Sequence, residues 1–235
     1  VVNCAAYTDV DGAEDDAGAA FAVNADGAGD VAAAAAEVGA SIVHVSTDYV
    51  FDGSKRTPWL ESDPVGPLGV YGASKLAGER AVARATPRHA IVRTAWLFGA
   101  GGRNFVDTML ALAAEREEVA VVTDQIGCPT WTGHLAPALV ELAKRPGETG
   151  LHHIAAGGAC SWNELAREVF ERSGADCRVR PATSDAFPRP APRPAYSVLG
   201  TERPHPLLLA HWRAGVAAYL RERAERARAS AGALS

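Results

Sequence analysis

The sequence has few of the residues that build disulfide frameworks or zinc sites. Its four cysteines are scattered, with no Cys-x-x-Cys pair: Cys4, Cys128, Cys160 and Cys177. This usage is typical of reduced thiols in the cytosol and argues against disulfides and zinc. The adjacent His152 and His153 have no acidic or thiol partner at ligand spacing, so we interpret them as core or surface histidines. We therefore identify no metal site and expect a cytoplasmic protein.

The chain also lacks an excess of positive charge. It has 23 Lys and Arg against 28 Asp and Glu, which gives a formal net charge of −5. This balance argues against a generic nucleic-acid or anionic-membrane partner. The sequence shows no signal peptide and no apolar run long enough to span a bilayer. We expect neither a nucleic-acid nor a membrane partner.

Apolar runs and helical patterns alternate along the chain. The hydrophobic content of 48% in 235 residues is enough for one large domain, or one domain with a small lobe. The alternation predicts a parallel sheet with helices on both faces. We expect strands at 1–6, 41–46, 89–94 and 119–123, helical segments at 14–38, 71–85, 104–117, 132–145, 161–173 and 210–228, and loops at 47–70 and 185–200.

Tyr71 and Lys75 give the strongest chemical signal. They stand four residues apart at the start of the predicted helix 71–85, so both project from one face. A phenol is a poor proton donor at neutral pH, but a nearby ammonium favours the phenolate and lowers the pKa. Thr47, at the carboxyl end of strand 41–46, can hydrogen-bond the same substrate oxygen. The pattern predicts reduction of a carbonyl, with Tyr71 as proton donor and Thr47 as hydrogen-bond donor. The alternative is an ordinary pair on a helix surface.

Several further segments carry a family resemblance. Two blocks are the most specific, Ser-Thr-Asp-Tyr-Val-Phe-Asp-Gly at 46–53 and Asp-Gln-Ile-Gly-Cys-Pro-Thr at 124–130. The other matching segments are 2–14, Asn24-Ala25, 71–75, 93–99, Asn104-Phe105 and 193–197. By these motifs, residues 1 to about 200 resemble the extended short-chain dehydrogenase/reductases, and more narrowly the dTDP-4-dehydrorhamnose reductases.

The resemblance implies a fold, a division of the chain and a reaction. The fold is a Rossmann-like, doubly wound parallel sheet with a small C-terminal substrate-binding lobe. Residues 1–145 would form the dinucleotide-binding domain and 146–235 mainly the lobe and the C-terminal helix, with an approximate, interleaved boundary. The reaction is NADPH- or NADH-dependent reduction of the 4-keto group of a dTDP-4-dehydro-6-deoxy-sugar. The narrowest expectation is conversion of dTDP-4-dehydro-L-rhamnose to dTDP-L-rhamnose.

Position and resemblance together assign the remaining residues of the site. The small residues after strand 1–6 allow a dinucleotide close to the backbone at a parallel-sheet edge. The expected cofactor contacts are Ala5, Ala6, Tyr7, Tyr71 and Lys75. The expected substrate contacts are Thr47, Asp48, Trp96, Asn104, Phe105 and Arg193. Trp96 could instead belong to the core, and Asn24 could either link to the catalytic loop or cap a local turn. Family resemblance adds Mg²⁺, for which no site is identifiable, and leaves a homodimer open.

One element of the family pattern is missing. Its members open with a strand and a Gly-x-x-Gly-x-x-Gly turn whose free helix-terminal amides hold the dinucleotide pyrophosphate. No segment here fits that turn, the chain begins at Val1, and its single methionine is Met109. With βαβ units of about 30 residues, roughly 60 residues are expected to be absent. We expect this chain alone to be inactive.

Two alternatives stay open. One is another dTDP-sugar 4-ketoreductase of natural-product biosynthesis, of the dihydrostreptose type. The other is a non-catalytic regulatory protein like the β-subunit of methionine adenosyltransferase. The joint presence of Thr47, Tyr71 and Lys75 favours chemistry. Gly200 departs from the family, in which an acidic residue is expected, so the C-terminal lobe follows the pattern less closely.

Overall fold

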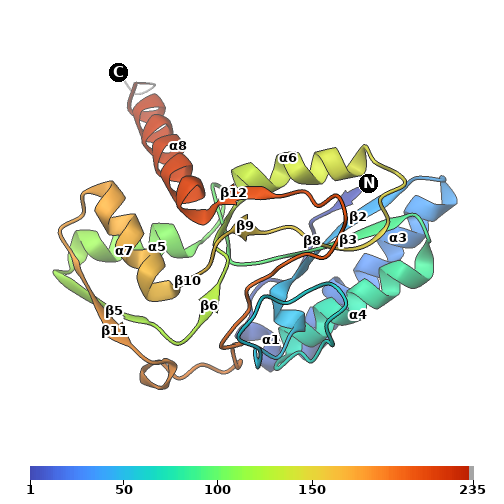
Figure 1. Cartoon of the computed structure of the whole chain (residues 1–235), viewed down its shortest axis with the longest axis horizontal. Helices are drawn as coiled ribbons and strands as arrows, with labels where there is room; N and C mark the ends of the chain where they lie inside the picture. The colour runs from blue at the N-terminus through green and yellow to red at the C-terminus, as the bar shows by residue number, and fades with distance from the viewer. Residues whose placement is uncertain (233–235) are drawn as a thin grey trace.

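The computed structural model describes residues 1–232. A four-stranded parallel sheet forms its centre, in the order β1-β2-β3-β8 (Figure 1). Its strands are β1 (Val2–Asn3), β2 (Ile42–Thr47), β3 (His89–Thr94) and β8 (Gly150–His153). Strands β2 and β3 are buried along almost their whole length, as parallel strands covered on both faces must be. The predicted α/β fold with a parallel sheet is confirmed.

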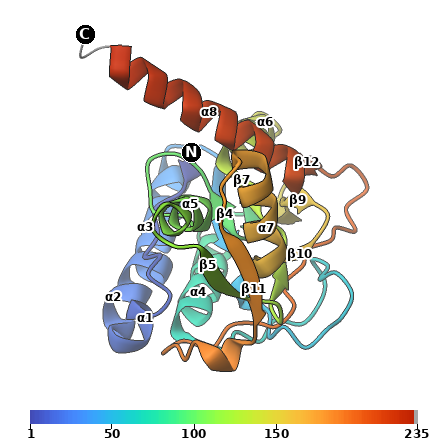
Figure 2. The same ribbon diagram turned by 90° about the vertical axis from the view of Figure 1, so that its left-hand side faces the viewer.

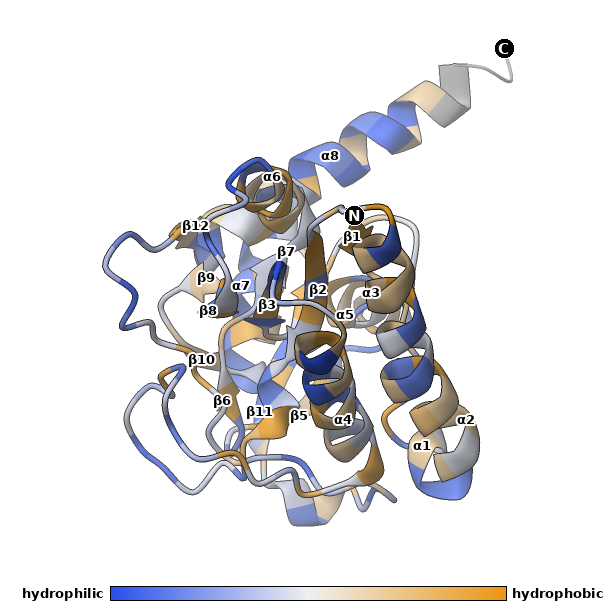
Figure 3. Ribbon diagram, turned by 90° about the vertical axis from the view of Figure 1, so that its right-hand side faces the viewer, coloured by the Kyte–Doolittle hydropathy of each residue, from blue (hydrophilic) through white to orange (hydrophobic). Residues whose placement is uncertain are grey.

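Helices cover both faces of this sheet (Figures 1 and 3). On one face, α3 (Gly27–Glu37) and α4 (Val70–Ala85) pack with Ile42 and Ile91. On the other, α6 (Thr132–Ala143) packs with their neighbours Val43 and Val92. Successive residues of a strand point to opposite faces of the sheet. Ile42 and Ile91 therefore contact one helical layer, and the residues that follow them, Val43 and Val92, contact the other. The alanine-rich sequence of α3 lets it approach closely, with Ala28, Ala32 and Ala35 in the interface.

The predicted helical region 14–38 is helical but interrupted. It consists of α1 (Gly12–Asp15), α2 (Ala17–Phe21), a π-helical turn (Ala22–Asp26) and then α3. A π-helical turn inside a helix re-aims the side chains within it. Here it carries Asn24, whose side chain is fully buried.

A second group of elements packs beside the sheet. Helices α5 (Phe105–Glu115) and α7 (Trp162–Ser173) share a core with the parallel pair β5 (Glu118–Val122) and β11 (Arg178–Ala182). Ser161 caps α7 through a capping box with Glu164. Helix α8 (Trp212–Gly232) packs on this core through Trp212, Val216 and Tyr219 and then extends outward (Figure 2).

Short strands and turns connect the two groups. The remaining strands are β4 (Leu97–Phe98), β6 (Ile126–Gly127), β7 (Thr130–Trp131), β9 (Ala156–Gly157), β10 (Cys160–Ser161) and β12 (Leu209–His211). Single 3₁₀ turns lie at Asp48–Val50 and Ser184–Ala186. The predicted loop 185–200 runs extended and pairs by single bridges at Tyr196 and Leu199. Among residues 1–232, no helix is both long and apolar enough to cross a bilayer.

Strands β8 and β11 are absent from the sequence-based expectation, and strand 1–6 is shorter than expected. Strand β8 follows the predicted domain boundary at 145, yet it pairs with β3 in the central sheet. The chain therefore returns to the first group after leaving it, which agrees with an interleaved division.

Candidate active site

The predicted catalytic residues meet at the carboxyl edge of the central sheet. Thr47 is the last residue of β2, and Tyr71 lies in the first turn of α4. The hydroxyl of Thr47 accepts from the backbone N–H of Tyr49, at 3.2 Å, and acts to lower the pKa of the nearby Tyr71 phenol. The ring of Tyr49 meets the Tyr71 ring edge-on, with centroids 5.7 Å apart. The structure thus brings together two hydroxyls from segments separated in sequence, as expected.

Gly72 allows this approach. A Cβ at this position would lie 2.2 Å from the carbonyl oxygen of Tyr49, which is backbone and cannot yield. Glycine therefore lets the first turn of α4 rest directly on the loop after β2. The Gly in Tyr-Gly-Ala-Ser-Lys has a steric role in placing Tyr71 beside Thr47.

Lys75 lies one turn further along α4 and is buried. Its ammonium donates to the carbonyl of Val45, at 2.7 Å. Burial lowers the pKa of Lys75 to about 8, against the opposing effect of Glu79. Burial raises the pKa of Tyr71 to about 12, with the nearby Thr47 hydroxyl acting in the other direction. The pKa of Tyr71 therefore moves opposite to the lowering expected from the Tyr/Lys spacing, because the phenol is desolvated.

Asp48 lies beneath the catalytic hydroxyls. It is 2% exposed, and its Oδ1 accepts from the Thr47 hydroxyl at 3.1 Å. Burial raises the pKa of Asp48 to about 7, and the hydrogen bond from the Thr47 hydroxyl acts in the other direction. The contacts of Asp48 are therefore internal, and its expected contact with the sugar stays a prediction.

Asn24 joins the segment after β1 to helix α4. Its side chain accepts from the backbone N–H of Tyr7 at 2.8 Å and donates to the Tyr7 carbonyl at 3.1 Å and to the Ser74 hydroxyl at 2.9 Å. Of the two roles left open for Asn24, the structure shows the link. The segment Ala5 to Tyr7 follows β1 at the same sheet edge as Thr47.

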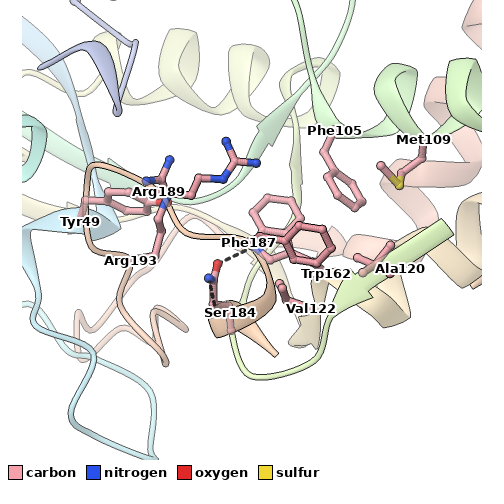
Figure 4. A pocket seen from close by; sticks show the side chains of 12 residues that line it. Tyr49, Phe105, Met109, Ala120, Val122, Trp162, Ser184, Phe187, Arg189 and Arg193 are labelled. Carbon is pink, nitrogen blue, oxygen red and sulfur yellow. Dashed lines mark hydrogen bonds between the residues drawn. The ribbon is translucent and has the colours of Figure 1, made fainter. Parts of the chain in front are cut away.

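A cleft of about 330 Å³ opens beside Tyr49 (Figure 4). One wall is aromatic: Phe105 and Trp162 have ring centroids 4.6 Å apart. Trp96 stacks on the far side of Trp162, at 3.5 Å and nearly parallel. Arg189 and Arg193 line the same cleft. The arrangement can hold a planar ring against the indole and an anionic group at the guanidinium groups.

Trp96 has an unusual backbone. Its φ of +47° is the only positive value among the non-glycine residues described, a conformation that costs energy for a side chain of this size. Gly127 lies under its indole, where a Cβ would be 2.3 Å from the ring. Trp96 is half-buried and stacked, so it supports the aromatic wall.

Arg193 is fixed by an ion pair. Its guanidinium donates to both carboxylate oxygens of Asp11, at 2.5 and 2.9 Å. This bidentate contact holds the pKa of Asp11 down, at about 2. Asp11 lies after β1 and Arg193 in the extended segment before β-bridge residue Tyr196, so the pair ties the cleft to the first part of the chain.

Phe105 and Asn104 have different positions. Phe105 lines the cleft. Asn104 caps α5, accepting from the N–H of Asp107 and donating to the carbonyl of Gly99, both at 3.0 Å. Its expected nucleotide contact stays a prediction, and the shown role is to orient the start of α5.

Sequence reasoning missed part of the cleft, namely Gln125, Trp162, Ser184, Phe187 and Arg189. The indole N–H of Trp162 donates to Gln125, whose amide donates to Ser184 (Figure 4). Gln125 lies in the 124–130 block, which was a usable signal. The others come from segments that gave none.

The residues present provide no metal site. Among residues 1–232, no three His, Cys, Asp or Glu side chains gather where they could hold an ion. The Mg²⁺ implied by resemblance has no set of ligands there, and no step below uses one. The four cysteines are free. Both His152 and His153 are buried, so the surface alternative for them is wrong.

Comparisons with known proteins show the family of the chain. Residues 1–225 match the model of a family described as the RmlD substrate binding domain. The chain is 50% identical over 206 residues to a dTDP-4-dehydrorhamnose reductase of Mycolicibacterium smegmatis, covering 86% of this chain and 63% of that protein. It is 49% identical over 205 residues to a probable dTDP-4,6-dihydroxy-2-methyloxan-3-one 4-ketoreductase of Streptomyces antibioticus, covering 86% and 70%.

A solved structure of a dTDP-4-dehydrorhamnose reductase has a similar fold. The dTDP-4-dehydrorhamnose reductase of Bacillus anthracis, in complex with NADP, superposes with a TM-score of 0.91 at 39% identity, over 94% of this chain and 79% of that one. The chain spans 63% to 79% of the lengths of these three proteins. Since the family model covers almost all of it and the identities are high, the chain belongs to the RmlD substrate-binding-domain family, which includes the dTDP-4-dehydrorhamnose reductases.

Proposed function

We propose that the protein reduces the 4-keto group of a dTDP-4-dehydro-6-deoxy-sugar with NADPH or NADH, and that the substrate is dTDP-4-dehydro-L-rhamnose. The observation that carries this proposal is that Thr47 and Tyr71 lie close together, with Lys75 one turn away on α4. Tyr49, whose ring contacts that of Tyr71, lines an aromatic and cationic cleft. The relatives named as reductases support it.

In the proposed reaction the C4 carbonyl oxygen binds between Thr47 and Tyr71. Thr47 donates a hydrogen bond that polarises the carbonyl, and Tyr71 transfers its proton to the oxygen as the alcohol forms. When bound, the nicotinamide supplies the hydride. Desolvation raises the pKa of the Tyr71 phenol, so Tyr71 is protonated at neutral pH when substrate arrives.

The cofactor contacts follow from the donor set. The Lys75 ammonium has three donors, and Val45 takes one, which leaves two for the ribose hydroxyls of a dinucleotide. Ala5, Ala6 and Tyr7 offer small side chains and backbone at the same edge. The complex of the Bacillus anthracis relative with NADP favours NADPH as the cofactor.

The cleft suits the nucleotide part of the substrate. A thymine ring would stack on Trp162 and Phe105, with Trp96 behind, and the diphosphate would lie at Arg189 and Arg193. The paired Asp11 holds Arg193 in place before the substrate arrives, which reduces the entropy lost on binding. Asp48 is proposed to act by orienting Thr47. Asn104 is proposed to act by orienting Phe105.

We further propose a cytoplasmic location, consistent with four free cysteines, and the division into residues 1–145 and 146–235. A homodimer is compatible with the proposal and no step requires it. A different dTDP-sugar 4-ketoreductase is the second candidate, because the Streptomyces antibioticus relative is almost as similar as the reductase from Mycolicibacterium smegmatis.

The test is an NADPH-oxidation assay. Because the chain spans 63% of the Mycolicibacterium smegmatis relative, the assay uses a chimera that joins residues 1–235 to the part of that relative that the chain does not match. We expect turnover with dTDP-4-dehydro-L-rhamnose to exceed that with other dTDP-4-keto sugars. Preference for another 4-keto sugar would select the second candidate, and binding without turnover of any would contradict both.

A further inference from the structure

A buried polar cluster lies behind the catalytic helix, outside the cleft. Its members are Glu79 on α4, Arg93 on β3 and Ser46 on β2, and each is at most 4% exposed. Glu79 stands four residues after Lys75, so both side chains leave the same face of α4 toward the sheet.

Both carboxylate oxygens of Glu79 are occupied. Oε1 accepts from the Ser46 hydroxyl at 2.6 Å and from Arg93 Nε at 2.9 Å, and Oε2 accepts from Arg93 Nη2 at 2.7 Å. The Arg93 guanidinium also lies over the ring of Phe51, 5.1 Å from its centre. Such a buried ion pair gains little net stability, because two charges are desolvated to form it. Its presence next to Lys75 on α4 therefore points to a role in charge placement.

The groups that interact with Lys75 come from α4, from the segment after β1 and from β2. Burial lowers the pKa of Lys75, and the carboxylate of Glu79 acts against that effect. Cys4, after β1, acts in the same direction as Glu79 and more weakly. Burial and the charge of Lys75 lower the pKa of His44 on β2 to about 3, so this histidine is neutral. Without Glu79, Lys75 would lie in a desolvated region without the carboxylate that favours its charged form.

We propose that Glu79 is a positioning residue, whose carboxylate one turn along α4 keeps Lys75 an ammonium directed at the sheet edge. Ser46 and Arg93 fix the carboxylate so that it cannot swing away. The proposal rests on the proposed function in assigning Lys75 to the reaction, but the charge state of Lys75 can be measured without substrate or cofactor.

The experiment uses the small number of lysines. The chain has only Lys55, Lys75 and Lys144, so lysine labelled with ¹³C at Cε gives three NMR signals, and Lys75→Met assigns the one from Lys75. We expect Glu79→Gln to lower the titration midpoint of Lys75 by about 1 pH unit, and Arg93→Met to raise it by about the same amount. The control Glu141→Gln removes an exposed carboxylate paired with Arg145 on α6 and should leave the Lys75 midpoint unchanged.

A second comparison covers the case in which Glu79→Gln alone does not fold. Arg93→Met carries Glu79 without its partner, and the double variant Glu79→Gln/Arg93→Met replaces the ion pair by neutral groups. The Lys75 midpoint should be about 1 pH unit lower in the double variant than in Arg93→Met. Equal Lys75 midpoints in these two variants would overturn the proposal. A Lys75 midpoint raised equally in Glu79→Gln and Arg93→Met would also overturn it, because hydration of a loosened core would produce that result.

Discussion

The buried carboxyl of Asp48 makes a quantitative prediction about stability and pH. Its pKa is raised by burial from 3.8 to about 7 in the folded chain. A raised folded pKa means that the native state holds the proton more tightly than the unfolded state does. The stabilisation is complete below pH 3.8 and is lost as the pH rises through 7. Between pH 5 and pH 8 the free energy of unfolding should fall by about 2.5 kcal/mol from this group alone.

Asp48→Asn isolates this contribution, because the amide keeps the shape and cannot ionise. Urea denaturation of the wild type and Asp48→Asn, each at pH 5 and pH 8, gives four unfolding free energies, and other titrating groups cancel in the double difference. Asp52→Asn is the control. Asp52 is exposed and its pKa is lowered by hydrogen bonds from Ser54, so this variant should retain the wild-type decrease between pH 5 and 8. Equal pH dependence in the wild type and Asp48→Asn would refute the reasoning.

Three further predictions concern the site. In the chimera, Tyr71→Phe should reduce kcat at least ~10²-fold by removing the proton donor, and near-normal reduction would exclude Tyr71 from that role. Gly127→Ala should displace Trp96, because a Cβ there would lie 2.3 Å from its ring. This variant should raise KM for the nucleotide sugar with little change in the circular-dichroism spectrum, and an unchanged KM would show that Trp96 has no role in substrate binding. Asp11→Asn should also raise KM, at least ~5-fold, by releasing Arg193, whereas a fall in kcat alone would place the pair elsewhere in the mechanism.

The fold could be predicted where apolar runs in the sequence correspond to strands that are buried on both faces. Strands 41–46 and 89–94 are continuous apolar runs, and such runs are what a sheet covered on both faces requires. Strand β8 was missed because it is four residues long and half of it is His152 and His153. Strand β11 carries Arg178, Arg180 and Pro181 at an edge, where proline is tolerated and local propensity gives no warning.

The site was predictable where one motif supplies its residues. Tyr71 and Lys75 are fixed relative to each other by one helix, and Thr47 follows from the end of the preceding strand. The cleft could not be predicted in the same way, because Trp162 and Arg189 reach it from distant segments through tertiary packing alone. The direction of the Tyr71 pKa shift was also beyond the sequence, since helical spacing shows the neighbouring lysine but not the burial that outweighs it.

The central claim is that this chain directs hydride to C4 of a nucleotide sugar while Tyr71 protonates the oxygen. The most direct measurement follows deuterium from NADPH labelled at nicotinamide C4 into the product formed by the chimera from dTDP-4-dehydro-L-rhamnose, read by mass spectrometry and proton NMR. The account predicts one deuterium, located at C4 of the sugar, from one of the two labelled faces of NADPH and little product from Tyr71→Phe. Deuterium at any other carbon, or an equal yield from Tyr71→Phe, would contradict it.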